Sequence, residues 1–203
     1  MLRRFFLKLT LNIFPPLFFN RIYLKNISPD YKQMNVVLKK SFTNINYYKS
    51  IFGGSIFSAC DPFFPIMYYH IFRKKKLIVW TKSAEIQYLS PAKSTLTLNF
   101  KISENNIEEI RLAIKKYGKC EIKNKVTAID KNKNACAEAE ITVYLRDPNF
   151  IDQNSSISWN AFFISNKTKF FSGSSFYRNS ITFNIDTFRK RIFHLIYERS
   201  KLW

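Results

Sequence analysis

A chain of 203 residues has the length of one domain, or of one domain with an appendage. Hydrophobic residues make up 46% of it, which is enough for a core, and the formal net charge is +19. Because the basic residues are spread along the chain and Lys, Asn, Ile and Phe are abundant, we interpret the charge as compositional drift of an AT-rich genome. A surface selected for anionic membranes or nucleic acid is the alternative, and the even spread argues against nucleic acid.

Cysteine and histidine show no pattern that would hold a metal ion or form a disulfide framework. There are only two His, and the three cysteines have no paired spacing: Cys60, Cys120 and Cys136. We therefore expect no metal, no cofactor and a cytoplasmic protein. The apolar N-terminus is interrupted by Lys8 and Pro15, and no stretch reaches the ~20 apolar residues of a membrane span.

Residues 2–14 predict a short amphipathic helix, because charged and apolar side chains alternate at helical spacing. The adjacent Pro15 and Pro16 end it. The apolar residues are Leu2, Phe5, Phe6, Leu9 and Ile13. We expect this face to cover part of the domain, and a helix lying on a membrane surface is the alternative.

The middle of the chain is rich in strand patterns. Strands are predicted at residues 22–24, 34–42, 77–80 running into 84–89, 95–102, 120–129 and 135–145. Asp130 to Asn134 predict a hairpin turn between the last two strands. A helix should begin at Ser103 and end at Gly118.

One long apolar stretch stands apart from these strands. It opens with Gly53 and Gly54, the only adjacent glycines, which allow a tight turn or the close approach of a ligand. Ser55 is placed to cap the helix that follows, and this helix should be buried on most sides. Pro62 and Pro65 each remove one backbone hydrogen bond and are expected to kink it.

Asp61 is the only charged residue between the glycine pair and Arg73. An ionised carboxylate in an apolar run loses water that its neighbours cannot replace. We therefore expect Asp61 to be paired, hydrogen-bonded or functional.

The order of these elements predicts an α+β fold in which a twisted antiparallel sheet wraps one long central helix. One face of the sheet would be buried, and the other would be solvated or paired with a second subunit. The N-terminal amphipathic helix and a C-terminal extension complete the prediction.

Several separated motifs agree in order and spacing with a known pattern. They are Asn46 followed by Phe52-Gly53-Gly54, then Asp61-Pro62, and residues 11–16, 28–31, 78–80 and 143–146. The pattern resembles the hotdog fold of acyl-CoA thioesterases, and within it a poorly characterised bacterial domain-of-unknown-function branch related to phenylacetate-type thioesterases. The resemblance covers residues 1–146 as a thioesterase-like domain and leaves 147–203 as a basic extension of unassigned role.

The resemblance implies an acyl-CoA thioesterase-like hydrolase in which Asp61 acts as general base or nucleophile and Asn46 orients water or the carbonyl. The substrate would bind at Phe52, Gly53, Gly54 and Ser55, where backbone N–H groups near Gly54 and Ser55 would hold the oxyanion. The implied partners are an acyl-CoA or related thioester and further copies of the chain, in a homodimer or homotetramer whose facing subunits build each pocket.

The sequence departs from the related patterns at three positions. Thr81 follows Trp80 where an acidic residue is common in the bacterial branch. Phe52 stands where the phenylacetate type has His, and Lys49 stands where the bacterial branch tends to have Gly.

The residues leave alternatives open. Asp61 can brace the kink at Pro62, and Asn46 can form a turn. The chain would then be a non-catalytic hotdog module that binds acyl-CoA or another lipid-like ligand. In the extension we expect short strands at 159–164 and 181–185 and a basic amphipathic helix over 188–203.

Overall fold

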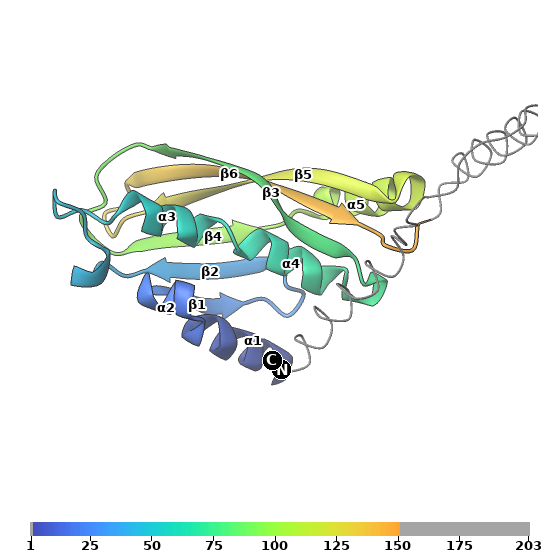
Figure 1. Ribbon diagram of the computed structural model, residues 1–203, viewed down its shortest axis with the longest axis horizontal. Helices are drawn as coiled ribbons and strands as arrows, with labels where there is room; N and C mark the ends of the chain where they lie inside the picture. The colour runs from blue at the N-terminus through green and yellow to red at the C-terminus, as the bar shows by residue number, and fades with distance from the viewer. Residues whose placement is uncertain (1, 151–203) are drawn as a thin grey trace, which may run out of the picture. The chain divides into compact units, whose positions relative to one another are not determined.

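The computed structural model describes residues 2–150 (Figure 1). The expected strands at 159–164 and 181–185 and the expected helix over 188–203 lie outside the described residues.

The centre of the fold is a six-stranded sheet in the order β1-β2-β4-β5-β6-β3, with every neighbouring pair antiparallel. Its strands are β1 (Ile22–Ile27), β2 (Gln33–Leu38), β3 (Ile78–Tyr88), β4 (Leu96–Lys101), β5 (Lys119–Ile129) and β6 (Ala135–Arg146). All six predicted strands are present. β3 and β1 form the two edges, so each has one side without a neighbouring strand among the described residues.

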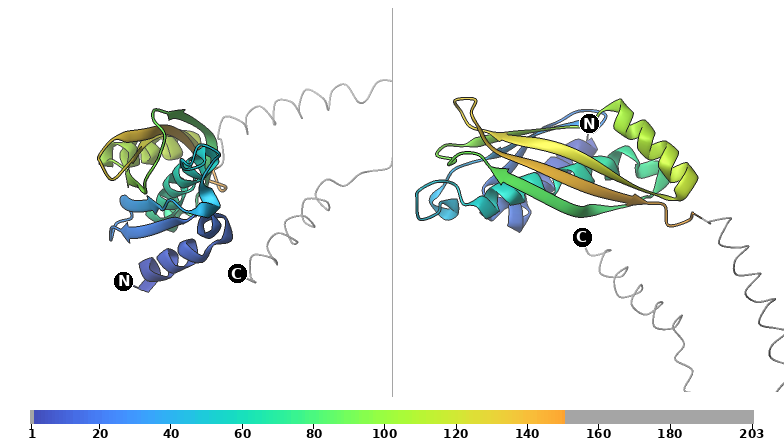
Figure 2. Two further views of the ribbon diagram at one scale, coloured as in Figure 1. Left: turned by 90° about the vertical axis from the view of Figure 1, so that its left-hand side faces the viewer. Right: turned by 90° about the horizontal axis from the view of Figure 1, so that it is seen from above.

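The helices lie in three places. They are α1 (Leu2–Ile13), α2 (Pro15–Phe19), α3 (Gly53–Cys60), α4 (Phe63–Ile71) and α5 (Glu104–Tyr117), with short 3-10 turns η1 (Phe42–Asn44) and η2 (Arg73–Lys75). α3 and α4 follow one another across one face of the sheet, and α1 and α2 lie along the edge strand β1 (Figure 1). α5 packs against β5 at one end of the sheet (Figure 2, right).

The core lies between the sheet and α4. Phe63, Phe64, Met67 and Tyr68 of α4 are all 0% exposed. Phe100 of β4 is equally buried, and its ring centroid lies 5.0 Å from that of Phe63 and 5.0 Å from that of Phe64. This arrangement confirms the predicted α+β hotdog fold, in which the sheet wraps a central helix.

The central helix is interrupted, whereas the sequence predicted one long kinked helix. α3 ends at Cys60 and α4 begins at Phe63, so Asp61 and Pro62 form a bend between them. Pro62 has no N–H to continue the ladder of α3. Pro65 lies in the first turn of α4, where backbone N–H groups have no intrahelical partner, so it costs no hydrogen bond there.

The expected N-cap of this helix was also wrong. Phe52 is the N-cap of α3, and Ser55 lies inside its first turn. The Ser55 hydroxyl instead donates to Oδ1 of Asn20 over 2.7 Å. Ser55 is 2% exposed and therefore connects α3 to the residue that ends α2.

The predicted strand over 34–42 ends early, at Leu38. The Lys39 N–H donates to the carbonyl of Arg21, and a capping box between Ser41 and Asn44 then starts η1. Phe42, which the alternation placed near the buried face, is 88% exposed as a result.

α1 covers part of the domain along β1, as expected, and Leu7 and Leu11 pack against the core. The apolar residues that the helical spacing selected lie on the other side of this helix. None of its residues is buried, and Leu2, Phe5 and Ile13 are each more than 60% exposed. Within residues 2–150, none of the helices combines the length and the apolar character needed to cross a bilayer.

Candidate functional site

A pocket of about 380 Å³ opens beside the start of α3. It brings together two residues that the sequence singled out, Asn46 and Gly53. Ile51 and Ile56 supply apolar wall from the helix side, and the chain from Tyr88 to Ala92, between β3 and β4, closes the other side. The pocket therefore combines apolar lining with the exposed start of a helix, as small-molecule sites often do.

Asn46 is held by its own loop. Its side-chain Oδ1 accepts from the Ser50 backbone N–H over 3.1 Å, and its Nδ2 donates to the Ser50 hydroxyl over 2.8 Å. The backbone closes the same loop through hydrogen bonds from the Asn46 N–H to the carbonyl of Ser50 and from the Lys49 N–H to the carbonyl of Asn46. Both polar atoms of the amide are thus occupied by the turn, as the turn-forming alternative expects.

Lys49 lies in the same turn with a φ of +58°. This left-handed conformation is strained for a side chain with a Cβ and is natural for glycine. The backbone therefore explains why Gly suits the position, and Lys49 accepts the strain in this chain.

The first turn of α3 presents unpaired backbone donors to solvent. Neither the Gly53 nor the Gly54 N–H has an acceptor among residues 2–150, whereas the Ser55 N–H donates to the carbonyl of Phe52 over 3.0 Å. The donors that could hold an oxyanion are therefore those of the two glycines, and the Ser55 N–H is already used. The Phe52 ring, 56% exposed, lies so close to Gly54 that an added Cβ would overlap it.

Tyr88 belongs to this site although no sequence pattern selects it. Its hydroxyl donates to the carbonyl of Gly53 over 3.0 Å, and its ring atoms lie 3.1 Å from where a Gly53 Cβ would stand. Burial, with the neighbouring Cys60 thiol, raises the pKa of Tyr88. The one signal was a tyrosine at the end of a strand followed by Ser90 and Pro91, which is too common to point to a site.

Asp61 lies at the bend after α3 and does not line this pocket. It is half-buried, and its carboxylate makes no hydrogen bond or ion pair with any residue between 2 and 150. The adjoining Cys60 is 1% exposed, and burial together with the charge of Asp61 raises the pKa of its thiol to about 12. Cys60 is therefore an unreactive core residue.

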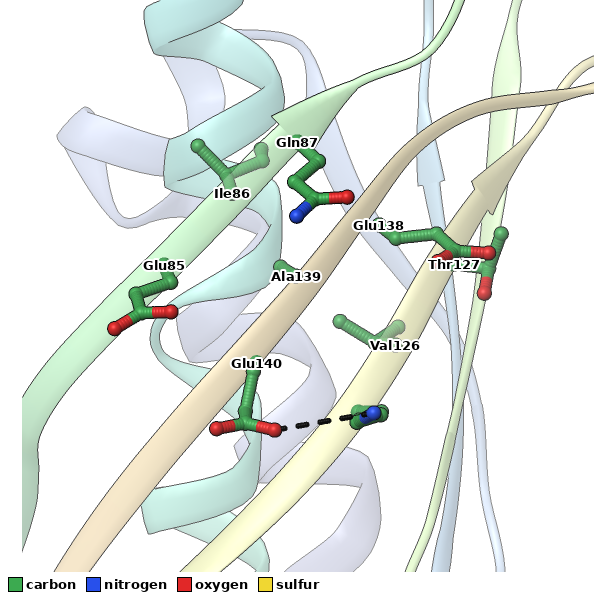
Figure 3. Close-up of a pocket in the computed structure, with 9 residues that line it drawn as sticks. Glu85, Ile86, Gln87, Val126, Thr127, Glu138, Ala139 and Glu140 are labelled. Carbon is green, nitrogen blue, oxygen red and sulfur yellow. Dashed lines mark ion pairs between the residues drawn. The ribbon is translucent and has the colours of Figure 1, made fainter.

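A larger hollow of about 610 Å³ lies over β3, β5 and β6 (Figure 3). Glu85, Glu138 and Glu140 face it, and Glu140 Oε2 lies 3.9 Å from Nζ of Lys125. This excess of carboxylates would repel the phosphates of coenzyme A. It is therefore the weaker candidate for a thioester site. In the part of the chain that the structure describes, no group of three His, Cys, Asp or Glu residues is arranged to hold a metal ion.

Comparisons with known proteins agree with the fold. A family model described as "Domain of unknown function (DUF4442)" matches residues 3–145. Among curated proteins, none matches the sequence.

Solved structures are similar in fold. The protein of unknown function PA5026 from Pseudomonas aeruginosa, described as a probable thioesterase, has a TM-score of 0.61 at 14% identity, over 70% of this chain and 95% of that one. A Chlorobaculum tepidum protein of unknown function has a TM-score of 0.58 at 12% identity, over 68% and 90%. The Escherichia coli PaaI protein of the phenylacetic acid degradation operon has a TM-score of 0.50 at 15% identity, over 66% and 85%. At these identities the likeness shows the fold alone. The chain belongs to the DUF4442 family, and its fold is the thioesterase-like hotdog fold of these neighbours.

Proposed function

We propose that the protein hydrolyses a thioester of the acyl-CoA class, with Asp61 as general base or nucleophile. The observation that carries the proposal is the half-buried Asp61 carboxylate, which has no side-chain or backbone partner between residues 2 and 150. A carboxylate that braced the bend at Pro62 would accept hydrogen bonds from it. A carboxylate held free beside a buried helix is available to water or to a thioester carbon.

The glycine pair supplies the second half of the chemistry. The free N–H groups of Gly53 and Gly54 point out of the helix start, where the helix dipole favours negative charge. They are suited to bind a thioester oxygen as it becomes an oxyanion. The hydrogen bond from Tyr88 to the Gly53 carbonyl stabilises the position of this turn.

One copy of the chain does not bring these two halves to the same carbonyl. Gly54 and Asp61 are seven residues apart on the central helix, which corresponds to ~10 Å along its axis. Both groups must lie within about 3 Å of the reacting atoms. We therefore propose that Asp61 of one subunit acts on a thioester held by the glycine turn of another.

The edge strand β3 supports such pairing. It is 11 residues long and hydrogen-bonds only β6 among the described strands. Ile78, Trp80 and Tyr88 on this strand are each at least 45% exposed. A long edge with exposed apolar residues is a template for another strand, so we propose a homodimer through β3. Further pairing through the sheet face would give a homotetramer.

A second candidate function is a non-catalytic module that binds acyl-CoA. The observation that favours it is the Asn46 side chain, because its Oδ1 and its Nδ2 are both bonded to Ser50, which ties the amide to its own turn. In this function the pocket beside α3 would bind a ligand without cleaving it.

The test measures thiol release from short-, medium- and long-chain acyl-CoAs by wild type, by Asp61→Asn and by a control variant. The control is Glu138→Gln, which changes a residue of the hollow over β3, β5 and β6. We expect hydrolysis by wild type, a loss of at least ~100-fold in kcat for Asp61→Asn, and no change in the control. Binding of a non-hydrolysable acyl-CoA thioether should persist in all three.

If folded wild-type protein hydrolysed no acyl-CoA of the panel, the proposed hydrolase function would be wrong. If the thioether still bound to it, the protein would instead be the non-catalytic binding module. Turnover that survives Asp61→Asn would remove Asp61 from the mechanism.

A further inference from the structure

The helices α1 and α2 expose more apolar surface than any other part of the described chain. The exposed apolar residues of α1, of α2 and of Phe14 between them are all between 42% and 70% exposed: Leu2, Phe5, Phe6, Leu9, Ile13, Phe14, Phe18 and Phe19. In these two helices only Leu17 is buried. An exposed apolar surface of this kind marks an interaction site.

The orientation of α1 is set by polar contacts. Successive helical residues turn by about 100°, so Arg4, Leu7 and Leu11 share one side and the exposed apolar residues share the opposite side. Leu7 and Leu11 pack against the core, and Nη1 of Arg4 donates to the carbonyl of Ile27 over 3.3 Å.

Asn12 fixes α1 to the open edge of the sheet. Its Oδ1 accepts from the Leu24 N–H over 2.7 Å, and its Nδ2 donates to the Leu24 carbonyl over 3.2 Å. The side chain thus takes the place of the neighbouring strand that edge strand β1 lacks. Because Leu7 and Leu11 pack against the core, the apolar residues on the opposite side of α1, such as Phe6 and Leu9, remain exposed.

A basic cavity of about 680 Å³ adjoins the N-terminal end of α1. Arg3 of α1, Arg111 of α5 and the run Arg73 to Lys76 line it, and no carboxylate does. The stacked rings of Tyr31 and His70, 4.6 Å apart and 9° from parallel, form part of its wall. Arg111 is paired with Glu108 over 3.4 Å, whereas the other cations of the cavity form no ion pair with a residue between 2 and 150. Such a concentration of cations is suited to bind phosphate groups.

We propose that α1 and α2 dock on an anionic phospholipid surface. The exposed apolar residues of the two helices enter the boundary between headgroups and acyl chains, and the basic cavity binds headgroup phosphates. An interfacial helix combines these features, with Leu and Phe on one side and Lys or Arg beside it. The proposal does not depend on hydrolysis of a thioester.

The charge of this surface favours an anionic bilayer over two other possible partners, a second copy of the chain and residues 151–203. Residues 2–29 contain no Asp or Glu and five Lys or Arg. A symmetric contact between two copies would bring these cations together without a carboxylate to pair with. Residues 151–203 carry a net positive charge as well, so they complement the surface less well than anionic lipid does.

The test is flotation of the full chain with vesicles of phosphatidylcholine alone or with one third phosphatidylglycerol. We expect binding to the anionic vesicles to be at least ~10-fold tighter and to weaken with added salt. The double variant Phe5→Ser/Phe6→Ser and the double variant Lys74→Glu/Lys75→Glu should each lose at least ~10-fold in binding.

Matched controls place the same changes elsewhere. Phe42→Ser changes a still more exposed phenylalanine outside the two helices, and Lys93→Glu/Lys131→Glu removes the same charge from exposed lysines away from the cavity. Both controls should bind vesicles as wild type does. Inorganic phosphate at millimolar concentration should compete only weakly, because it lacks the apolar part of the interaction.

Several outcomes would overturn the proposal. They are equal binding to neutral and anionic vesicles, no flotation of the full chain, or controls that weaken binding as much as the test variants. If Phe5→Ser/Phe6→Ser instead dissociates an oligomer in sedimentation and no vesicle binding occurs, the surface belongs to a second copy.

Discussion

α1 and α4 are both rich in large apolar residues, yet they have opposite environments. In α4, Phe63, Phe64, Met67 and Tyr68 are completely buried against the sheet. In α1 no residue is buried at all. The difference arises from position, because α4 crosses the inner face of the sheet whereas α1 is attached to edge strand β1 by hydrogen bonds. A high apolar content shows that a helix has an apolar face, but the tertiary contacts decide whether the core or another molecule buries that face.

The largest expected effect concerns the thiol at the end of α3. At pH 8 a pKa of about 12 leaves Cys60 with roughly a thousandfold less thiolate than a thiol at the ordinary 9.0. Cys60 should therefore resist iodoacetamide, while a Thr10→Cys variant on exposed α1 should react quickly. Mass spectrometry of the labelled chain gives both rates.

The pH dependence sharpens this prediction. Because the thiol has its raised pKa only in the folded state, its contribution to stability is complete below about pH 9 and is lost as the pH rises towards 12. Labelling of Cys60 should increase about tenfold per pH unit across that range. Rapid labelling at pH 8 in the native state would contradict the burial of the central helix.

The second prediction compares one phenylalanine from each helix. Phe64→Ala should lower the free energy of unfolding by ~3–5 kcal/mol, because it leaves a cavity beside Phe100. Phe6→Ala, at a position 54% exposed, should change it by no more than ~0.5 kcal/mol. Urea denaturation of the two variants measures the difference. Similar losses would show that α1 is also part of the core.

The smallest effect concerns the one hydroxyl buried in α4. Tyr68 donates to Oδ1 of Asn124 over 2.8 Å, and burial raises its pKa to about 12. Tyr68→Phe should cost ~1 kcal/mol of unfolding free energy by removing this hydrogen bond.

A double variant with Asn124→Leu tests the origin of that cost. If the hydrogen bond is responsible, the two changes should cost less together than the sum of each alone. Additive losses in urea denaturation would assign the cost of Tyr68→Phe to packing.

The candidate site was only partly predictable. Asn46 and Gly53 do line one pocket, and a helix is present as predicted, although it begins at Gly53 and not after an N-cap at Ser55. Tyr88 was missed because it reaches Gly53 from 35 residues away, and no local pattern reports such a contact. The amide of Asn46 was expected to orient water or the carbonyl, or to form a turn. It bonds Ser50 within its own loop, and its role toward a substrate stays a prediction.

Elements that depend on residues close together in the chain could be predicted from the sequence. The alternation of apolar residues predicted β4, and Ser103 and Gly118 end α5 as expected, with the Ser103 hydroxyl accepting from the Asn106 N–H and Gly118 at a φ of +69°. A strand period and a helix cap depend on residues a few positions apart, so they can be recognised in the chain.

Tertiary structure alone decided the strand order, the outward face of α1 and the free carboxylate of Asp61. These features depend on which residues distant in sequence come together, or fail to. Examples are the bonds of Asn12 to Leu24 and the packing of α4 on the sheet. Periodicity gives the direction of an apolar face relative to its own helix axis. Only the packing of the complete domain decides whether that face meets the core or solvent.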